Sequence, residues 1–328
     1  MLKKDQPITV LSLFDGCSAA FLALERAGYT IKKYYSSEID KNAIAIQDYH
    51  YSADTRFVKI GDVRNLWSID YLDVDIIIMG SPCTQLSSVN IKDRSGLEGK
   101  DSKLFYVALK LIGEINFLQD SGKSLYFLAE NVASMSKANR NAITHELQAI
   151  FPDTKMLKID SALVAPAHRR RLYWTNLPTA SIPNPTGKKF QDVLVNGFTE
   201  KEKANVLLSG NVTATNGIFR HYKMNMGNVI FKDGDFACLP IKEKLLAYSA
   251  ILKQSTYNGR ARGNKDEYAF PNGCYRSPSV LERERLMTFP DGYISGVPGV
   301  SRTEKNKILG LSFTVDVIAH LLHTKSNK

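Results

Sequence analysis

The sequence predicts an α/β fold, built on a doubly wound parallel sheet and interrupted by a smaller, irregular domain. Two observations support this prediction. In the first half of the chain, short apolar runs alternate with segments of helical periodicity, as they do in sheets with helices on both faces. After Asn176 the alternation stops, and the chain becomes irregular and basic as far as about Arg276.

The expected strands are short runs rich in Val, Ile, Leu, Tyr and Phe, several of which end at a Gly or an Asp. They cover residues 8–14, 33–37, 57–60, 75–79, 124–128, 155–159 and 171–174. Between them, apolar residues three and four apart indicate helices. These helices cover residues 19–27, 41–49, 104–118 and 139–150. After the irregular stretch, residues 279–287, 302–309 and 315–323 show the helical pattern again.

The change in character divides the chain into three predicted segments. Residues 1–176 form the α/β domain, residues 177–275 form an inserted domain, and residues 276–328 return to the α/β domain. Prolines at 178, 183 and 185 mark a linker at the first boundary. Residues 177–276 hold 14 Lys and Arg against 8 Asp and Glu, so this segment carries much of the positive charge.

The composition predicts a soluble globular protein that works in a reducing interior. The 328 residues are 44% hydrophobic, and no apolar run approaches the roughly 20 residues that a membrane span needs. The first residues lack the apolar region of a signal peptide. The four cysteines are far apart, which argues against a zinc site or a disulfide framework. We therefore expect no metal and a cytoplasmic or nucleoid-associated location.

The charge balance predicts a polyanionic partner. The formal net charge is +10 and the sequence pI is about 9.2. Proteins with this excess of Lys and Arg often bind nucleic acid, although charge alone does not identify the partner.

Cys83 is a candidate nucleophile. The sequence Gly80-Ser81-Pro82-Cys83 directly follows an apolar run, so the cysteine is expected just beyond the end of a strand. In open α/β sheets, ligands bind and chemistry takes place at that edge. The alternative is a buried cysteine in a strand-end turn, since free cysteines are often buried.

Acidic residues follow the first three expected strands. Asp15 lies in the turn Phe14-Asp15-Gly16, Glu38 ends the second strand, and Asp62 follows the third after Gly61. Such acids can accept hydrogen bonds from the ribose and the adenine amino group of an adenosine ligand. Each could instead be a solvated turn residue or a helix cap. The turn lacks G-x-G-x-x-G, which disfavours a pyrophosphate-containing cofactor.

The fifth strand and the basic triplet further on complete the candidate site. Glu130 and Asn131 are expected just after the strand, where Glu130 would be partly desolvated and could lie near Cys83. A helix cap is the alternative for this pair. Arg169 and Arg171 precede or begin a strand, and alternate residues of a strand share a side. We therefore expect both to point the same way, unless the triplet is simply a solvated face.

These motifs, taken in order, resemble the cytosine-C5 DNA methyltransferases along essentially the whole chain. The resemblance rests on FDG at 14–16, Glu38, Asp62, Pro82-Cys83, Glu130-Asn131-Val132, Arg169-x-Arg171 and Gly310-x-Ser312. Several blocks, including LSLFDGCSAAFLAL and AHRRRLYWTNLP, are most similar to the de novo branch of animals. The stretch RSPSVLERERLMTFPDGY is closer to bacterial and phage forms. The resemblance implies a Rossmann-like methyltransferase sheet, a target-recognition domain at 177–275, and a compact phage, bacterial or viral source.

The resemblance also implies a role for each site residue. Cys83 would add to C6 of cytosine, Glu130 would protonate or hydrogen-bond N3, and Arg169 and Arg171 would lie around the target base. Asn131, together with Pro82, would support the active-site loop. The cofactor would be S-adenosyl-L-methionine, with S-adenosyl-L-homocysteine as product. Its contacts would come from Phe14, Asp15, Gly16, Cys17, Ser18, Glu38, Ile39, Asp62, Val63, Leu104 and Ser312.

Two departures from the family pattern lie at the cofactor end. Ser18-Ala19-Ala20 stands where most relatives keep more glycine, which leaves less room at the methionine end. Leu311 stands where bacterial relatives usually carry an asparagine, and leucine cannot donate a hydrogen bond to the cofactor carboxylate.

By resemblance the partner is double-stranded DNA, from which the target base is flipped out, with residues 86–103 closing as a lid. A restriction endonuclease could accompany such an enzyme, and the oligomeric state stays open. A tRNA-modifying branch shares the catalytic residues, so an RNA cytosine methyltransferase is the main alternative. A catalytically silent regulator would lack the cysteine or the glutamate, and both are present. A nicotinamide or flavin oxidoreductase fits poorly without the phosphate-binding glycines.

Overall fold

The computed structural model describes most of the chain, with gaps. The described residues are 2, 4–82, 103–120, 122–207, 221–222, 225, 227–247, 256–257, 260–261, 267–270 and 274–323. Cys83 lies outside them, and so do residues 86–102 of the expected lid. Parts of the expected target-recognition segment, such as 208–220 and 248–255, also lie outside.

The chain divides into two compact units. Unit 1 consists of Met1–Asp160, Arg170–Pro183 and Val315–Lys328, and unit 2 consists of Ser161–Arg169 and Asn184–Thr314. The expected boundary at 176/177 thus lies a few residues before the division at Pro183. Of the expected return segment at 276–328, only the part from Val315 onward belongs to unit 1.

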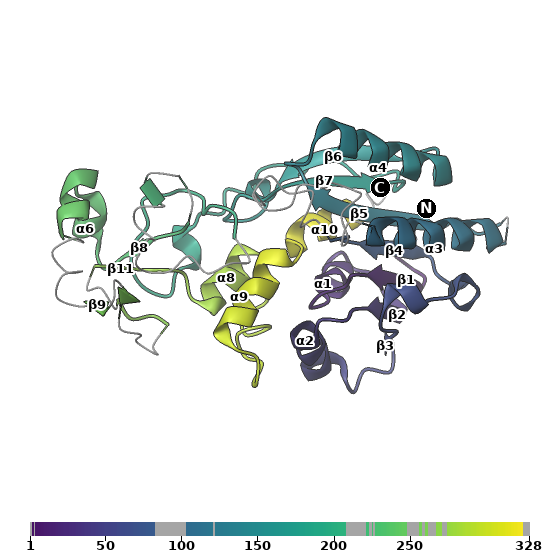
Figure 1. Ribbon diagram of the computed structural model, residues 1–328, viewed down its shortest axis with the longest axis horizontal. Helices are drawn as coiled ribbons and strands as arrows, with labels where there is room; N and C mark the ends of the chain where they lie inside the picture. The colour runs from purple at the N-terminus through teal and green to yellow at the C-terminus, as the bar shows by residue number, and fades with distance from the viewer. Residues whose placement is uncertain are drawn as a thin grey trace. The chain divides into compact units, whose positions relative to one another are not determined.

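Unit 1 is built on a seven-stranded sheet with the order β3-β2-β1-β4-β5-β7-β6 (Figure 1). The strands are β1 (Ile8–Leu13), β2 (Ile31–Ser37), β3 (Phe57–Lys59), β4 (Ile76–Met79), β5 (Tyr126–Val132), β6 (Lys155–Asp160) and β7 (Arg170–Thr175). The central strands β1 and β4 are buried along their whole length. This burial explains their nearly continuous apolar sequence, because a strand covered on both faces has no polar side.

The sheet is mixed, which corrects the expectation of a wholly parallel sheet. β1 pairs in parallel with β2 and β4, and β4 pairs in parallel with β5. β7, however, lies between β5 and β6 and runs antiparallel to both. Only residues 161–169 join β6 to β7. A parallel crossover needs a dozen or more residues, so this short connection returns the chain antiparallel.

Helices cover both faces of the sheet. They are α1 (Ala19–Arg26), α2 (Lys41–Tyr51), α3 (Leu104–Leu118), α4 (Lys137–Ile150) and α10 (Val315–Leu322), with the 3₁₀ turns η1 (Val63–Asn65) and η2 (Ser68–Tyr71). α3 and α4 pack on one face, where Ile77 and Phe127 belong to a common hydrophobic cluster. α1 packs against α10, and the Tyr29 hydroxyl donates to the Leu322 carbonyl at 2.9 Å.

Unit 2 contains short elements joined by irregular chain. Its described elements are η4 (Ser161–Leu163), η5 (Gln191–Val193), β8 (Ile230–Phe231), α6 (Gly234–Cys238), β9 (Thr256–Tyr257), β10 (Arg260–Ala261), β11 (Tyr275–Arg276), α8 (Val280–Leu286) and α9 (Arg302–Leu311). β8 and β11 pair antiparallel, and a small core of Val229, Phe231, Cys274 and Tyr275 lies around them.

Candidate functional site

The end of β5 differs from the sequence-based expectation. Glu130 and Asn131 were expected after the strand, but β5 runs on to Val132, so both lie inside it. Pairing with β7 continues through these residues and holds them in extended backbone. On the other side, Met79 at the end of β4 pairs with Ala129. The turn that follows β4 therefore starts beside Glu130. The expectation that the fourth and fifth strands lie close together is confirmed.

Asn131 ties the end of β5 to that turn. Its Nδ2 donates to Ser81 Oγ at 3.1 Å and lies 3.4 Å from the Ser81 carbonyl oxygen. Its Oδ1 accepts from the backbone N–H of Val132 at 2.7 Å. Both Asn131 and Ser81 are buried, and the chain continues from Ser81 into Pro82. The contact fixes the start of the segment that leads to Cys83.

Glu130 and Arg171 form a buried ion pair across β5 and β7. Glu130 is paired with Tyr173, and Val132 with Arg171, so Glu130 and Arg171 are diagonal neighbours on one face. Arg171 Nε lies 2.7 Å from Glu130 Oε1, and the side chains are 13% and 10% exposed. No N–H of the described residues is directed at Oε1, so the contact is an ion pair by distance and not a hydrogen bond. Glu130 is thus fixed but retains the capacity to bind a further group.

Arg169 makes a different contact. β7 begins at Arg170, so Arg169 lies before the strand, and the expectation that Arg169 and Arg171 share a strand face is wrong. The side chain of Arg169 is buried in unit 2, and its Nη1 donates to the Gly310 carbonyl at 3.0 Å. The structure therefore brings Arg169 to the Gly310-x-Ser312 motif, where Ser312 ends α9.

The turn between β1 and α1 has an unusual backbone. Phe14 has φ of 57°, Gly16 has 61° and Ser18 has 61°, all in the left-handed region. Glycine adopts this conformation readily, whereas Phe14 and Ser18 do so at a cost on the order of 1–3 kcal/mol each. Strain of this kind persists only when surrounding contacts hold it, and it gathers at functional sites.

Asp15 is the centre of the contacts that hold this turn. It is 5% exposed, and its carboxylate points inward. Burial raises the pKa of Asp15, and hydrogen bonds from neighbouring hydroxyls oppose this rise. Five side chains donate to it: Ser12, Ser18, Tyr34, Ser36 and Gln47. The predicted cofactor contact at Asp15 is thus occupied by the protein itself on both oxygens.

Glu38 lies at the end of β2 and binds the same turn. Its Oε2 accepts from the Gly16 N–H at 2.7 Å. Its Oε1 accepts from the N–H groups of Ile39 and Asp40, both at 2.8 Å. The structure therefore brings together Gly16 and Glu38, which the sequence placed at the ends of two different strands.

Asp62 lies at the next strand end and pairs locally with Arg64. It accepts from the Arg64 N–H at 2.9 Å and caps η1, while the Arg64 guanidinium pairs with the carboxylate. Hydrogen bonds from this side chain lower the pKa of Asp62. The Ser37 hydroxyl donates to the Gly61 carbonyl at 2.7 Å, which links the end of β2 to the residue before Asp62.

The backbone is open at two of these strand ends. A Cβ built at Gly16 or at Gly61 would meet no described atom within 4 Å. Ile39 is 63% exposed and offers an apolar surface beside Glu38. Acid oxygens, open backbone and exposed apolar surface together fit a nucleoside with ribose hydroxyls and an amino group.

The other predicted cofactor contacts occupy more enclosed positions. Cys17 and Val63 are buried, at 1% and 5% exposure. Leu104 begins α3 and packs against the main hydrophobic cluster. Leu311, next to the predicted contact Ser312, is by contrast 58% exposed in unit 2.

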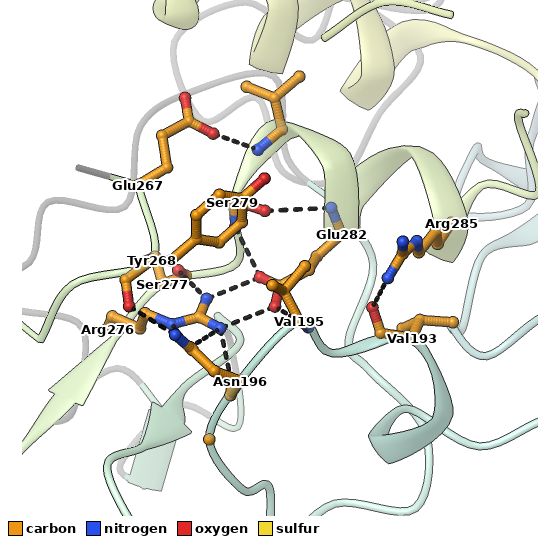
Figure 2. A network of polar contacts seen from close by, with 12 residues as sticks. Val193, Val195, Asn196, Glu267, Tyr268, Arg276, Ser277, Ser279, Glu282 and Arg285 are labelled. Atoms are coloured by element: carbon orange, nitrogen blue, oxygen red, sulfur yellow. Dashed lines mark hydrogen bonds and ion pairs between the residues drawn. The ribbon is translucent and has the colours of Figure 1, made fainter. Parts of the chain in front are cut away.

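Unit 2 is organised by a second buried ion pair (Figure 2). Arg276 donates from Nη1 to Glu282 Oε2 and from Nη2 to Glu282 Oε1, both at 2.7 Å. The same guanidinium binds the carbonyl and the side chain of Asn196. Glu282 also accepts from the N–H groups of Val195 and Ser279, the latter as part of a capping box at α8. The network joins residues 195–196 to residues 276–282 within unit 2.

A second polar cluster lies elsewhere in unit 2. Glu200 contacts His221 Nε2 at 2.6 Å, accepts from Lys244 Nζ at 2.7 Å, and accepts from the Tyr222 hydroxyl at 3.2 Å. Burial raises the pKa of Glu200, but the hydrogen bonds from His221 and Lys244 outweigh it and lower the pKa to about 2. The cluster gives a buried lysine and a buried histidine an anionic partner.

Several residues of the site were not found by sequence reasoning. Tyr34, Ser36 and Gln47 hold Asp15 but belong to no catalytic motif. A signal existed for Gln47, because it shares the buried side of α2 with Ala43 and Ile46, where an apolar residue is expected.

Among the described residues, no helix is long and apolar enough to cross a membrane. The described side chains also contain no group of three or more potential metal ligands.

Comparison with known proteins identifies related sequences. The model of the C-5 cytosine-specific DNA methylase family matches residues 8–156. The DNA (cytosine-5)-methyltransferase DRM1A of Oryza sativa subsp. japonica is 32% identical over 124 residues, 35% of this chain and 26% of that protein. The type II methyltransferase M.NgoPII of Neisseria gonorrhoeae is 28% identical over 146 residues, 44% of this chain and 39% of that protein. The matches thus span well under half the length of these relatives.

Solved structures share the fold over nearly the whole chain. A DNMT2 mutant from Spodoptera frugiperda has a TM-score of 0.62 at 18% identity, over 96% of this chain and 98% of that one. The Entamoeba histolytica methyltransferase EhMeth has a TM-score of 0.65 at 14% identity, over 97% of each chain. At these identities the likeness establishes the fold. This chain is therefore similar to the C-5 cytosine-specific DNA methylases in sequence over residues 8–156, and it shares its fold with methyltransferases over nearly its whole length.

Proposed function

We propose that the protein is a DNA cytosine-C5 methyltransferase that uses S-adenosyl-L-methionine and a covalent Cys83 intermediate. The observation that carries this proposal is the Glu130–Arg171 pair, which lies at the end of β5 beside the turn that leads into Pro82-Cys83. Activation of cytosine requires a carboxyl group and a nucleophile such as a cysteine thiolate, and Cys83 follows Ser81 of the described turn by two residues in the sequence.

In the proposed mechanism, the Cys83 thiolate adds to C6 of the flipped-out base. A bond forms between sulfur and C6, and the electron pair of the C5–C6 double bond becomes available at C5. Glu130, after taking up a proton from solvent, would stabilise this state by donating it, or a hydrogen bond, to N3, and Arg171 would keep Glu130 in place. C5 would then take the methyl group as the methyl–sulfur bond of the cofactor breaks, with S-adenosyl-L-homocysteine as the leaving group. Loss of the C5 proton to a base and return of the N3 proton to Glu130 would restore the double bond and expel the thiolate, which frees the enzyme.

The cofactor site is proposed at the ends of β1, β2 and β3. S-adenosyl-L-methionine supplies an electrophilic methyl group when bound. Glu38 would accept the ribose hydroxyls, Asp62 would accept the adenine amino group, and Ile39 would cover the adenine ring. The open space at Gly16 and the exposure of Ile39 support this placement. The contacts that Glu38 and Asp62 now make with Gly16 and Arg64 would then be shared or exchanged.

Double-stranded DNA is the proposed substrate. Residues 177–275 would recognise the target, and their excess of Lys and Arg would contact phosphates, while a few polar side chains would read the bases. The large basic segment favours a duplex over a compact RNA, although the catalytic residues would serve either substrate.

The test is covalent trapping by the purified protein. With S-adenosyl-L-methionine present, duplex DNA containing 5-fluorocytosine should form a stable adduct, because fluorine at C5 cannot leave as a proton. Cys83→Ser should form no adduct and transfer no methyl group while DNA binding largely survives. Undiminished turnover in Cys83→Ser would contradict the mechanism.

The substrate is tested in parallel. Adducts on duplex DNA support the proposal, whereas adducts on tRNA alone would identify an RNA methyltransferase. Absence of both, with the protein folded, would point to a silent regulator. Bisulfite sequencing of host DNA after expression would then give the recognition sequence.

A further inference from the structure

The turn after β1 is held by hydrogen bonds that come from two directions. From β1 and the turn itself, Ser12 and Ser18 donate their hydroxyls to Asp15, the latter at 2.6 Å. From β2, Tyr34 and Ser36 donate theirs to the same carboxylate, at 2.5 and 2.7 Å. Asp15 therefore fastens the turn to the strand that carries Glu38 at its end.

Ser18 is a strained member of this arrangement. Its φ of 61° is a conformation that side chains with a Cβ rarely adopt, and its side chain makes no capping hydrogen bond to α1. Its hydroxyl instead donates to Asp15. A hydrogen bond therefore holds Ser18 in a conformation that glycine adopts freely.

The turn places the backbone N–H of Gly16 at the proposed cofactor site. The Asp15 N–H donates to the Ser37 carbonyl at 3.1 Å, and the next N–H, that of Gly16, donates to Glu38 Oε2 at 2.7 Å. If Ser18 relaxed to negative φ, the backbone between Asp15 and α1 would rotate. The Gly16 N–H would then no longer point at Glu38, and their hydrogen bond would be lost.

We propose that Ser18 and Asp15 act as positioning residues for cofactor binding. They hold the turn in its left-handed form, so that Gly16 and Glu38 are prearranged for the nucleoside. This inference rests on the proposed function for the identity of the ligand. Neither residue needs to touch the reacting atoms, since Asp15 is buried and all its contacts described above are internal.

The test compares Ser18→Ala with Ser18→Gly. Alanine loses the hydroxyl and keeps the Cβ, so the turn should relax, and the dissociation constant for S-adenosyl-L-homocysteine should rise about tenfold. Glycine also loses the hydroxyl but adopts positive φ without strain, so its constant should rise only about threefold. Both constants are measured by titration calorimetry on the whole chain.

A matched control removes a hydrogen bond far from the turn. Trp174 Nε1 donates to the Thr144 hydroxyl at 2.8 Å, and Thr144→Val deletes this bond within unit 1 together with the one from that hydroxyl to the Arg140 carbonyl. The control should lower the melting temperature about as much as Ser18→Ala without weakening ligand binding. In Ser18→Ala, KM for S-adenosyl-L-methionine should rise while kcat stays within about twofold.

Hydrogen exchange of the Gly16 amide tests the conformation of the turn without any ligand, so its result does not depend on the proposed function. In the unliganded protein, the Gly16 amide should exchange faster in Ser18→Ala than in the wild type or in Thr144→Val, because its contact with Glu38 is lost. Unchanged exchange, or ligand affinity in Ser18→Ala within twofold of wild type, would overturn the inference alone. A wild-type protein that binds no S-adenosyl-L-homocysteine would overturn the proposed function, and the assignment of this turn to it.

Discussion

The two units each contain a buried pair of arginine and glutamate, and the two pairs are satisfied to different degrees. In unit 2, both oxygens of Glu282 accept from the Arg276 guanidinium, and the side chains are 0% and 2% exposed. In unit 1, Glu130 lies 2.7 Å from Arg171, yet its Oε1 receives no directed hydrogen bond from the described residues.

The difference separates a structural pair from a candidate catalytic one. A buried charge is stable when hydrogen bonds satisfy it, and a buried acceptor without a donor costs free energy. The Arg276–Glu282 pair therefore has nothing left to offer a ligand. Glu130 is held in place but incompletely bonded, which is the state expected of a carboxyl group that meets its partner only when substrate is present.

Glu130→Gln should have the largest effect on catalysis. Removing the group proposed to serve N3 should lower kcat by about 10²- to 10⁴-fold. The melting temperature should change little, because the amide keeps the shape of the side chain. Methyl transfer to duplex DNA and calorimetry measure the two quantities, with the exposed Glu146→Gln as control. A kcat equal to that of the control would remove Glu130 from the mechanism.

Glu282→Gln should have the opposite effect, lowering stability and leaving catalysis nearly unchanged. Breaking a buried, hydrogen-bonded pair leaves Arg276 uncompensated and should lower the free energy of unfolding by about 3–5 kcal/mol. Well below the melting transition, kcat should remain close to the wild-type value. Urea denaturation measures the loss, and replacing both partners by apolar residues should recover part of it. Stability like that of wild type would show that the pair is not structural.

Arg171→Lys and Arg276→Lys test what the arginine contributes to each of the two ion pairs. Lysine keeps the charge but lacks the planar guanidinium, so Glu130 should be held less well and kcat should fall about tenfold. The matched change Arg276→Lys should reduce stability and leave kcat unaltered. Steady-state kinetics and thermal melts of both variants decide the matter. If Arg171→Lys lost stability alone, both pairs would be structural.

The smallest expected effect is the pH dependence from Glu200. Its pKa is about 2 in the folded protein and near the ordinary 4.5 when unfolded. Because the folded value is the lower one, this group stabilises the fold above about pH 4.5, and that contribution is lost as the pH falls toward 2. The urea midpoint of Glu200→Gln should therefore depend less on pH below 4.5 than that of wild type. Parallel curves for both proteins would contradict this assignment.

Much of the fold of unit 1 followed from the sequence. The helix expected at residues 104–118 is α3, with the same bounds, because its apolar residues recur at helical spacing. The strands were placed to within a few residues, except that β5 continues through Glu130 to Val132. The polar residues at its end gave no strand signal, since pairing with β7 and not local preference keeps them extended.

The sequence by itself determined the order of the elements and the identity of the candidate residues, because apolar periodicity and motif spacing are local properties of the chain. Only the tertiary structure decided which of these residues meet. β7 runs antiparallel beside β5, and this arrangement brings the Arg171 side chain to Glu130. Arg169, two residues earlier in the chain, contacts Gly310 instead. The same holds for Asp15, whose partners on β2 and α2 turned a predicted ligand contact inward. These contacts depend on the pairing and packing of distant segments, and no local pattern records them.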